Sequence, residues 1–338
     1  MQMERFDPAT DAAQVRACHG MYLAGASVDD PHAPPPSFPG FRGWLRYGWS
    51  EDPQETWLAR DIAGAPCGWF VLTVPERENR SYAYLHLFVH PARRRAGLGR
   101  ALARHAAARA VRSGRTLLNG DTREGSAGDA FARTVGAREG ITAVRRVLRL
   151  ATLSQPALAG LRATAQATAR GYSLLRWEGP VRPEHAAAIA AVTNAADDMP
   201  TATGQEAQRW DAARVRRTEL RIAAQGQHFY TVVARHDASG ELAGYTQLEV
   251  DPLVPEWGYQ GLTAVARPHR GHRLGLLVKF GMLDLLAARE PALRHIITGN
   301  ADGNEHMVAI NDALGFEPLD RWTSWEMDAA AVMLRDCA

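Results

Sequence analysis

Two copies of a short basic stretch that contains glycine lie 176 residues apart in this chain of 338 residues. The first copy, VHPARRRAGLG, covers residues 89–99, and the second, VARPHRGHRLG, covers residues 265–275. Each copy follows an apolar segment typical of a strand and precedes an apolar segment typical of a helix. A repeat at about half the chain length constrains the fold strongly, because it predicts two similar units in tandem.

The order strand, turn, helix around each copy indicates a binding site for an anion. Pro91 ends strand pairing in the first copy because proline has no N–H to donate. The glycines let the backbone approach a ligand closely, and the arginines add charge and forked donors. The N–H groups of a helix N-terminus also favour negative charge. The turns are therefore predicted to bind phosphate, although a surface turn rich in arginine would have the same composition.

Three kinds of phosphate-binding turn can be compared with the first copy. A Walker loop is excluded, because no Gly-Lys-Ser/Thr follows the glycines. A dinucleotide-binding turn would need a third glycine where Leu102 stands. Asp121 nevertheless lies about 20 residues further on, where the acidic residue that binds ribose is expected, so this alternative stays open.

The third kind matches best. The first copy resembles the V-x-P-x-x-[RQ]-x-x-G-x-[GA] motif of the GNAT superfamily of N-acetyltransferases, which bind the pyrophosphate of acetyl-CoA at this turn. In the second copy Val265, Arg270 and Gly275 keep the pattern, while Arg273 stands at the position of the first glycine. The matching residues of the first copy are Val89, Pro91, Arg94, Gly97 and Gly99.

The resemblance implies the fold class α/β (α+β), with two tandem GNAT folds. Each would have a mixed, mostly antiparallel sheet, splayed between its fourth and fifth strands and flanked by helices. Residues 1–150 are predicted to form the N-terminal GNAT domain, with 144–150 as its closing strand. Residues 151–170, rich in small side chains, are predicted to be a partly helical linker, and 171–338 the C-terminal GNAT domain.

The resemblance also implies that acetyl-CoA, or another acyl-CoA, is the co-substrate. In the C-terminal unit Asn300 and Asn304 would contact its pantetheine and pyrophosphate arm, although asparagine also caps helices well. The residues expected to hold the co-substrate are Val89, Arg94, Arg95, Ala96, Gly97, Leu98, Gly99 and Arg100 in the first unit and Thr263, Val265, Arg270, Gly271, His272, Arg273, Leu274, Gly275, Asn300 and Asn304 in the second.

Amide formation sets the requirements for the catalytic groups. A primary amine attacks the thioester carbonyl directly in a ternary complex, so no nucleophilic side chain is needed. A backbone N–H at Val89 or Val265 is the expected donor to the developing oxyanion. Glu249, on the strand beside the second repeat's strand, is a candidate general base. His86 is the candidate in the N-terminal unit, where it and His90 would flank an expected bulge.

The last helix of the C-terminal unit and the residues that follow it match the family pattern better than the same segment of the N-terminal unit. Many GNAT proteins carry a tyrosine in the last helix. In the second unit Asn311 stands at that position and is a candidate catalytic residue, and in the first unit Ala132 stands there. The rest of this segment follows the family pattern at Asn304, Met307, Gly315 and Phe316. We therefore expect the C-terminal unit to be the catalytic one. No donor is assigned to the CoA thiolate in either unit.

Three functions remain open at this point. The first is an N-acyltransferase acting on a small-molecule amine, the second a protein lysine or N-terminal acetyltransferase, and the third a sensor that binds acyl-CoA without turnover. The segment 29–40, DDPHAPPPSFPG, is too rich in proline for a helix or a central strand, and aromatic residues surround it. The resemblance implies that the segment after the first helix borders the acceptor pocket, so this segment would cover the pocket, which favours a small molecule. An ordinary surface loop beside aromatic residues of the core is the alternative.

Composition excludes several classes of partner. The net charge of +2 gives no reason to expect nucleic acid. Cys18, Cys67 and Cys337 have neither metal-ligand spacing nor the pattern of a disulfide framework, so no metal is expected. The polar start, MQMERFDPATDA, does not resemble a signal peptide, and no apolar run reaches membrane-spanning length. A cytoplasmic protein without a membrane partner is expected, either a monomer or a homodimer.

Overall fold

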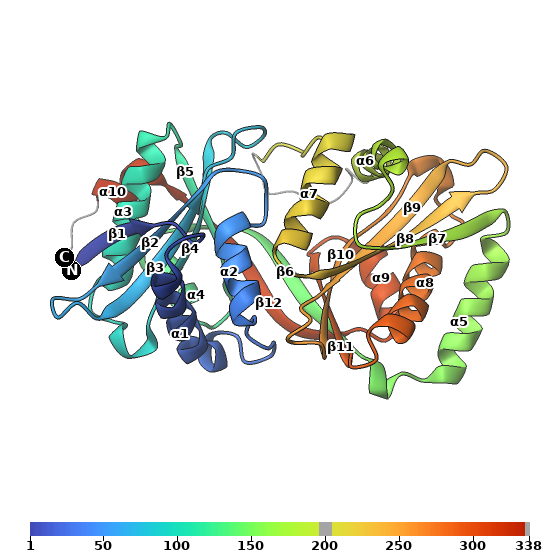
Figure 1. Cartoon of the computed structure of the whole chain (residues 1–338), viewed down its shortest axis with the longest axis horizontal. Helices are drawn as coiled ribbons and strands as arrows, with labels where there is room; N and C mark the ends of the chain where they lie inside the picture. The colour runs from blue at the N-terminus through green and yellow to red at the C-terminus, as the bar shows by residue number, and fades with distance from the viewer. Residues whose placement is uncertain (196–204, 335–338) are drawn as a thin grey trace. The chain divides into compact units, whose positions relative to one another are not determined.

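The computed structural model describes residues 1–195 and 205–334 of the chain (Figure 1). It divides into two compact units. The N-terminal unit comprises Met1–Ala143, Thr201–Glu206 and Asp320–Ala338, and the C-terminal unit comprises Val144–Pro200 and Ala207–Leu319. The domain boundaries predicted along the chain, 1–150 and 171–338, stay a prediction. Of the residues discussed above, Cys337 lies outside the described part of the chain.

The sheet of the N-terminal unit has the strand order β1-β2-β3-β4-β5-β12. Neighbouring strands are antiparallel except β4 and β5, which are parallel. This is the mixed, mostly antiparallel sheet that the family resemblance implied. The strands are β1 (Gln2–Phe6), β2 (Gln54–Arg60), β3 (Pro66–Thr73), β4 (Tyr82–Val89), β5 (Leu117–Arg123) and β12 (Glu317–Asp328).

The sheet of the C-terminal unit repeats this arrangement in the order β7-β8-β9-β10-β11-β6. β10 and β11 are parallel, in the place that β4 and β5 hold in the other unit, and the neighbours from β7 to β10 are antiparallel. The strands are β7 (Tyr172–Glu178), β8 (His228–His236), β9 (Leu242–Val250), β10 (Trp257–Val265), β11 (His295–Ala301) and β6 (Arg138–Arg149).

Alternation along the strands divides each unit into two apolar layers. In the N-terminal unit Trp69 and Val71 of β3 pack with α1 (Ala12–Asp29) and α2 (Phe38–Tyr47), while Phe70 and Leu72 pack on the other face with α3 (Leu98–Arg112). α4 (Ala127–Thr134) and α10 (Ala329–Leu334) lie on the α3 face as well. The sheet is therefore covered on both sides.

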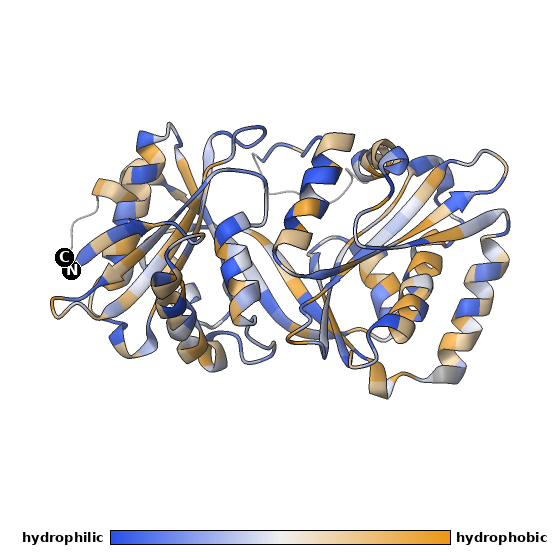
Figure 2. Ribbon diagram, viewed as in Figure 1, coloured by the Kyte–Doolittle hydropathy of each residue, from blue (hydrophilic) through white to orange (hydrophobic). Residues whose placement is uncertain are grey.

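The C-terminal unit has the same layers. α6 (Ala186–Ala195) and α7 (Ala212–Ala224) pack on one face with Tyr245, and α8 (Leu274–Arg289) packs on the other with Leu248. α9 (Glu305–Leu314) shares the α8 face, and α5 (Gln155–Thr168) packs on α8. Figure 2 shows hydrophilic and hydrophobic residues alternating along α5 and α7, as expected of helices with one buried side.

The closing strands differ from the expected arrangement. Residues 144–150 were expected to close the N-terminal unit, but β6 lies beside β11, and its residues from Val144 onward belong to the C-terminal unit. The N-terminal sheet is instead completed by β12, whose Trp322–Asp328 pair with β5. Alternation identifies a strand but not which of two similar sheet edges it joins, so the sequence did not reveal this arrangement.

Two local expectations also need correction. The proline-rich segment is shorter than expected, because α2 begins at Phe38 with Pro39 in its first turn. Proline is tolerated there, since the first N–H groups of a helix have no partner within it, and the Ser37 side chain caps the helix by accepting from Gly40 N–H. The sequence also predicts a helix over residues 206–224, but α7 begins only at Ala212, where Asp211 caps it.

Candidate active site

Both sheets open at the strand that precedes a repeat. β4 and β5 pair only at Tyr82–Leu117, Ala83–Leu118 and Tyr84–Asn119, although β4 continues to Val89. β10 and β11 pair in the same way over three residues, ending at Tyr259 with Ile297. Each unit thus has two parallel strands that separate before reaching the turn.

The backbone N–H of Val89 points into the first opening. His90 N–H donates to Cys67 O at 3.1 Å, so the adjacent pair, Val89 with Gly68, is one that exchanges no hydrogen bonds. The Val89 N–H is therefore directed away from β3 and toward the β5 side, where the ladder has ended.

Val265 has the same geometry in the C-terminal unit. Ala266 N–H donates to Ala243 O at 2.8 Å, which makes Val265 and Gly244 the pair without hydrogen bonds. The Val265 N–H is directed to the β11 side and into the opening. The two residues predicted to polarise the thioester carbonyl thus occupy equivalent positions.

Each turn contains two residues with left-handed backbone conformation. In the first turn they are Arg95 (φ 66°) and Gly97 (φ 78°), and in the second Gly271 (φ 87°) and Arg273 (φ 54°). The left-handed pair is therefore conserved between the repeats while glycine and arginine exchange places. Arg273 at the first-glycine position adopts the conformation that glycine would adopt.

The helices after the turns begin with N–H groups that have no partner within the helix. The first hydrogen bonds of the helices run from Ala101 N–H to Gly97 O in α3 and from Leu277 N–H to Arg273 O in α8. The N–H groups before these point out of the helix end, as at other anion-binding helix termini. Ala96 and His272 are exposed at equivalent places beside them.

The conserved arginines brace the turns from within. Arg94 donates through Nε to Val89 O at 3.1 Å and forms an ion pair with Asp29. Arg270 likewise donates through Nε to Val265 O at 3.2 Å, and its guanidinium reaches Ala195 O at 3.1 Å. Both side chains therefore fix the end of the strand, and their contact with a ligand stays a prediction.

The second glycine of each motif packs against the last helix. A Cβ at Gly99 would lie 3.1 Å from the Phe131 ring of α4, and one at Gly275 would lie 3.0 Å from Cδ1 of Ile310 on α9. These glycines allow the helix N-terminus to approach the neighbouring helix closely. Substitutions there would disturb packing as well as any ligand.

The two openings differ by a β-bulge. The register of β10 with β9 shifts between Gln260 and Thr263, so that Gly261 and Leu262 both oppose Gln247. β4 keeps one register with β3 from Tyr84 to Val89, so the bulge expected near His86 and His90 is absent from this strand. The extra residue leaves part of the β10 backbone unpaired and increases the local twist.

Glu249 lies on the α6 and α7 face of the C-terminal sheet. It alternates in step with Tyr245, which packs among the residues of that face, and it pairs with Tyr259 of β10. Burial raises the pKa of its carboxyl, and the nearby Arg221 acts in the opposite direction. A partly buried carboxylate with a raised pKa, beside the strand that carries the bulge, has the properties of a general base.

Glu219 of α7 is a buried acid that the sequence analysis did not single out. It accepts a hydrogen bond from Val181 N–H at 3.1 Å, and burial raises the pKa of its carboxyl. On the same face the Tyr245 hydroxyl and Thr193 Oγ1 lie 2.7 Å apart. The amphipathic helix gave no signal that this glutamate faces inward.

His86 lies on the α1 and α2 face of the N-terminal sheet, opposite Leu85 and Leu87 as expected. Its ring centroid is 4.8 Å from that of Trp44 and 5.5 Å from that of Trp69. The indole rings partly exclude water from the imidazole and lower its pKa, although the ring keeps access to solvent.

The asparagines of the C-terminal unit are not equivalent. Asn311 is fully buried, and its Nδ2 donates to Oδ1 of Asn300 at 2.9 Å. Its Oδ1 is buried without a hydrogen-bond partner in the described part of the chain. Asn304 caps α9 by accepting from Met307 N–H, and Asn300 lies within β11 rather than at a cap. Thr263 contacts Thr246, with their hydroxyl oxygens 2.7 Å apart.

Sequence reasoning missed a matched pair of glycines opposite the predicted oxyanion donors. A Cβ at Gly68 would lie 2.9 Å from Phe88 O, and one at Gly244 would lie 2.8 Å from Ala264 O. They lie 176 residues apart, like the motifs themselves. Extending the repeat alignment backward would have found them.

Within residues 1–195 and 205–334, no group of three or more His, Cys, Asp or Glu side chains is arranged to hold a metal ion. Among the helices of those same residues, none has the length and apolar character that crossing a membrane requires.

Comparisons with known proteins agree with this geometry. The model of the acetyltransferase (GNAT) family matches residues 22–126, within the N-terminal unit. A solved tandem GNAT protein from the clavulanic acid biosynthesis pathway has 31% identity and a TM-score of 0.84, covering 97% of this chain and 98% of its own. The chain belongs to the GNAT family. It is accordingly an acetyltransferase built from tandem GNAT folds.

Other solved GNAT structures share the fold at lower identity. The glucosamine N-acetyltransferase region of a fungal multi-domain GH3 β-N-acetylglucosaminidase has 14% identity and a TM-score of 0.67, covering 96% of this chain and 38% of that one. A GNAT protein from Sphaerobacter thermophilus has 16% identity and a TM-score of 0.64, covering 97% and 95%. A search among curated protein sequences found no match.

Proposed function

We propose that this GNAT protein transfers an acetyl or longer acyl group from acyl-CoA to a primary amine of a small molecule, by direct attack in a ternary complex. We place the reaction in the C-terminal unit. The observation that carries this choice is the bulge of β10, which has no counterpart in β4.

The proposed oxyanion donor is the backbone N–H of Val265. Its direction follows from the β9–β10 register, and it needs no reorganisation when the carbonyl oxygen gains charge. Thr263 lies two residues earlier on the same edge, next to the bulge, and the α8 N-terminus with Gly271, His272 and Arg273 would bind the pyrophosphate.

The proposed base is Glu249. In this mechanism the carboxylate accepts one proton of the ammonium, and the neutral amine nitrogen bonds to the carbonyl carbon. The C–S bond then breaks, and the excess proton that the nitrogen still carries passes through water to the departing thiolate, so that a neutral amide and CoA thiol are formed. The carboxyl lies on the face of the sheet opposite α8, so amine and CoA would approach from different faces. Asn311, at the usual tyrosine position, would orient the leaving group without donating an acidic proton.

A small-molecule acceptor is supported by a structural relative whose biosynthetic pathway is known. The tandem GNAT protein that shares 31% identity with this chain comes from a biosynthetic pathway for a small molecule, clavulanic acid. The comparison extends over nearly the whole of both chains, so the two proteins have the same architecture.

For the N-terminal unit we propose a second function, the binding of acyl-CoA without turnover. Its turn keeps the left-handed residues and the open helix N-terminus of the other unit. Its β4 lacks the bulge, and the candidate base that it offers is His86 between two tryptophans. These features support binding more than catalysis.

Release of free CoA thiol from acetyl-CoA, measured across a library of small amines, tests the proposal. Turnover with at least one amine, lost in Glu249→Gln, is the expected result. CoA binding without turnover across a broad library would favour the sensor. Label transfer from acetyl-CoA to proteins of an extract, but not to small amines, would favour a protein substrate.

A further inference from the structure

The single lysine of this chain lies in the core of the C-terminal unit. The sequence contains 39 lysines and arginines together, and Lys279 is the only lysine among them. Its side chain is 3% exposed on α8, and burial alone lowers the pKa of its amine to about 7, with no charged neighbour contributing. An arginine would stay charged at this buried position, whereas a lysine can lose its proton. This difference explains why a lysine stands here in a chain whose other basic residues of this kind are arginine.

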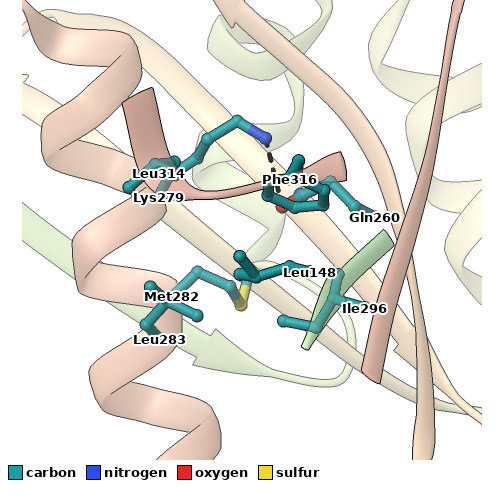
Figure 3. Close-up of a pocket in the computed structure, with 8 residues that line it drawn as sticks. All are labelled: Leu148, Gln260, Lys279, Met282, Leu283, Ile296, Leu314 and Phe316. Carbon is teal, nitrogen blue, oxygen red and sulfur yellow. Dashed lines mark hydrogen bonds between the residues drawn. The ribbon is translucent and has the colours of Figure 1, made fainter. Parts of the chain in front are cut away.

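The Lys279 amine contacts the strand at the point where the sheet opens. Nζ donates to Oε1 of Gln260 at 3.4 Å (Figure 3), and Gln260 directly follows Tyr259, the last residue of β10 that pairs with β11. A cavity of about 10 Å³, room for one water molecule, adjoins both side chains, and the Phe316 ring centroid lies 5.3 Å from Nζ.

Gln260 in turn bridges the bulge. Its Nε2 donates to Gln247 O at 2.7 Å and to Thr246 Oγ1 at 2.7 Å. Gln247 is the residue that faces the two bulged residues, so the side-chain amide satisfies a carbonyl where the ladder is interrupted. The Thr246 hydroxyl continues the chain of contacts to Thr263, two residues before Val265.

The N-terminal unit fills the same place with apolar side chains. Residue 103, equivalent to Lys279 by the repeat, is a buried alanine, and Leu85 and Phe70 stand where Gln260 and Thr246 stand. This unit also lacks the bulge. The polar network and the bulge therefore occur together in one unit and are both absent from the equivalent position of the other.

We infer that Lys279 is a positioning residue for the acyl-transfer site: it holds Gln260 across the bulge of β10 and so fixes the direction of the Val265 N–H. This inference rests on the proposed function of the C-terminal unit. It assigns Lys279 no contact with substrate. Its effect on the reaction passes through Gln260 and the backbone.

A double-mutant cycle tests the inference. Lys279→Met keeps length and removes the donor, and Gln260→Leu gives the residue found in the N-terminal unit. Each single variant should lower kcat about tenfold with little change in the KM for acyl-CoA, because a misdirected oxyanion donor is lost only in the transition state. The double variant should be no worse than Gln260→Leu alone, since Lys279 acts through Gln260.

Amide hydrogen exchange in the free protein gives a readout that does not depend on activity. Residues 258–265 should exchange faster in Lys279→Met than in the wild type, while residues 82–89 of the other unit stay unchanged. Additive losses of kcat, or exchange of β10 unaffected by both substitutions, would overturn the inference. If exchange responds but the wild type shows no acyl transfer, the bulge support stands and the proposed function fails.

Discussion

The two sheet openings of this protein share the same strand arrangement and differ in the register and side chains of the strands that border them. In the N-terminal unit β4 keeps a single register, and the position where the strands part is lined by Leu85 and by Gly120, whose Cβ would lie 2.8 Å from Leu85 O. In the C-terminal unit β10 carries a bulge supported by Gln260 and Lys279. Because the turns are alike while the strands beside them differ, we expect binding of the co-substrate and catalysis to be separable.

The largest expected effect concerns the base. Glu249→Gln should lower kcat by about a thousandfold, the usual range for a positioned general base, whereas His86→Asn should leave it nearly unchanged. In the wild type the rate should rise with pH through the raised pKa of Glu249, since the base is the deprotonated form. Steady-state rates as a function of pH, with acetyl-CoA and an accepted amine, provide the measurement.

Folding gives an independent control for this variant. The folded-state pKa of Glu249 is raised, so the folded protein binds its proton more tightly than the unfolded chain and loses stability as pH rises above the unfolded value. Glu249→Gln should therefore unfold at a slightly higher temperature at neutral pH. A variant that is both inactive and less stable would point to a structural role instead.

The next effect separates the two turns. Ala96→Glu and His272→Glu place a carboxylate beside equivalent helix N-termini without altering a glycine. His272→Glu should lower turnover about a hundredfold, because a like charge set against a bound diphosphate costs several kcal/mol, and Ala96→Glu should leave turnover within about threefold.

Calorimetry with CoA sharpens this comparison, with Ala96→Gln and His272→Gln as uncharged controls. Each glutamate variant should remove one binding event and leave the other. The opposite pattern of turnover would move catalysis to the N-terminal unit, and unchanged binding in both would refute the phosphate-binding role of the turns.

A smaller effect tests the environment of Lys279 through stability. Its folded pKa of about 7 lies below the unfolded value of about 10.4, so the cost of burying the amine is full below pH 7 and falls as pH rises between these values. The free energy of unfolding of the wild type relative to Lys279→Met should rise by about 3 kcal/mol between about pH 6 and about pH 9. Denaturant unfolding at several pH values measures it, and a flat difference would show that the amine is not buried uncharged.

The smallest effect concerns the exchanged left-handed residues. Arg95→Gly and Arg273→Gly should each stabilise the protein by about 1 kcal/mol, because an L-residue at positive φ is strained. Gly97→Ala and Gly271→Ala should destabilise it by about 1 kcal/mol for the same reason. Thermal unfolding of the four variants measures these opposite effects on stability. An alanine at Gly97 or Gly271 that stabilises the protein would contradict the prediction.

Much of the architecture could be predicted from the sequence because the signals are local or repeated. The 176-residue repeat located both turns, and the strand that the sequence predicts over residues 242–250 is β9. Asn304, for which co-substrate contact and helix capping were the two interpretations, caps α9. The family resemblance supplied the mixed sheet and its opening between the fourth and fifth strands, and both are present in each unit.

The features that were missed depend on contacts between distant residues. Nothing near Gln260 in the sequence shows that its amide meets Gln247 O, and Lys279 resembles an ordinary residue of an apolar helix. The bulge adds a single residue to β10. It is recognised only when the pairing of β10 with β11 is compared with the pairing of β4 with β5. The partner of each closing strand is decided by tertiary pairing rather than by propensity.

The pairing of β12 with β5 has a consequence for how the chain folds during synthesis. The half that leaves the ribosome first cannot complete its sheet until Trp322–Asp328 have been made, so its β5 edge stays unpaired while the whole second half is translated. Nascent-chain maturation of the earlier half therefore waits on the later one, and cutting the gene at its midpoint would separate a sheet from its own last strand.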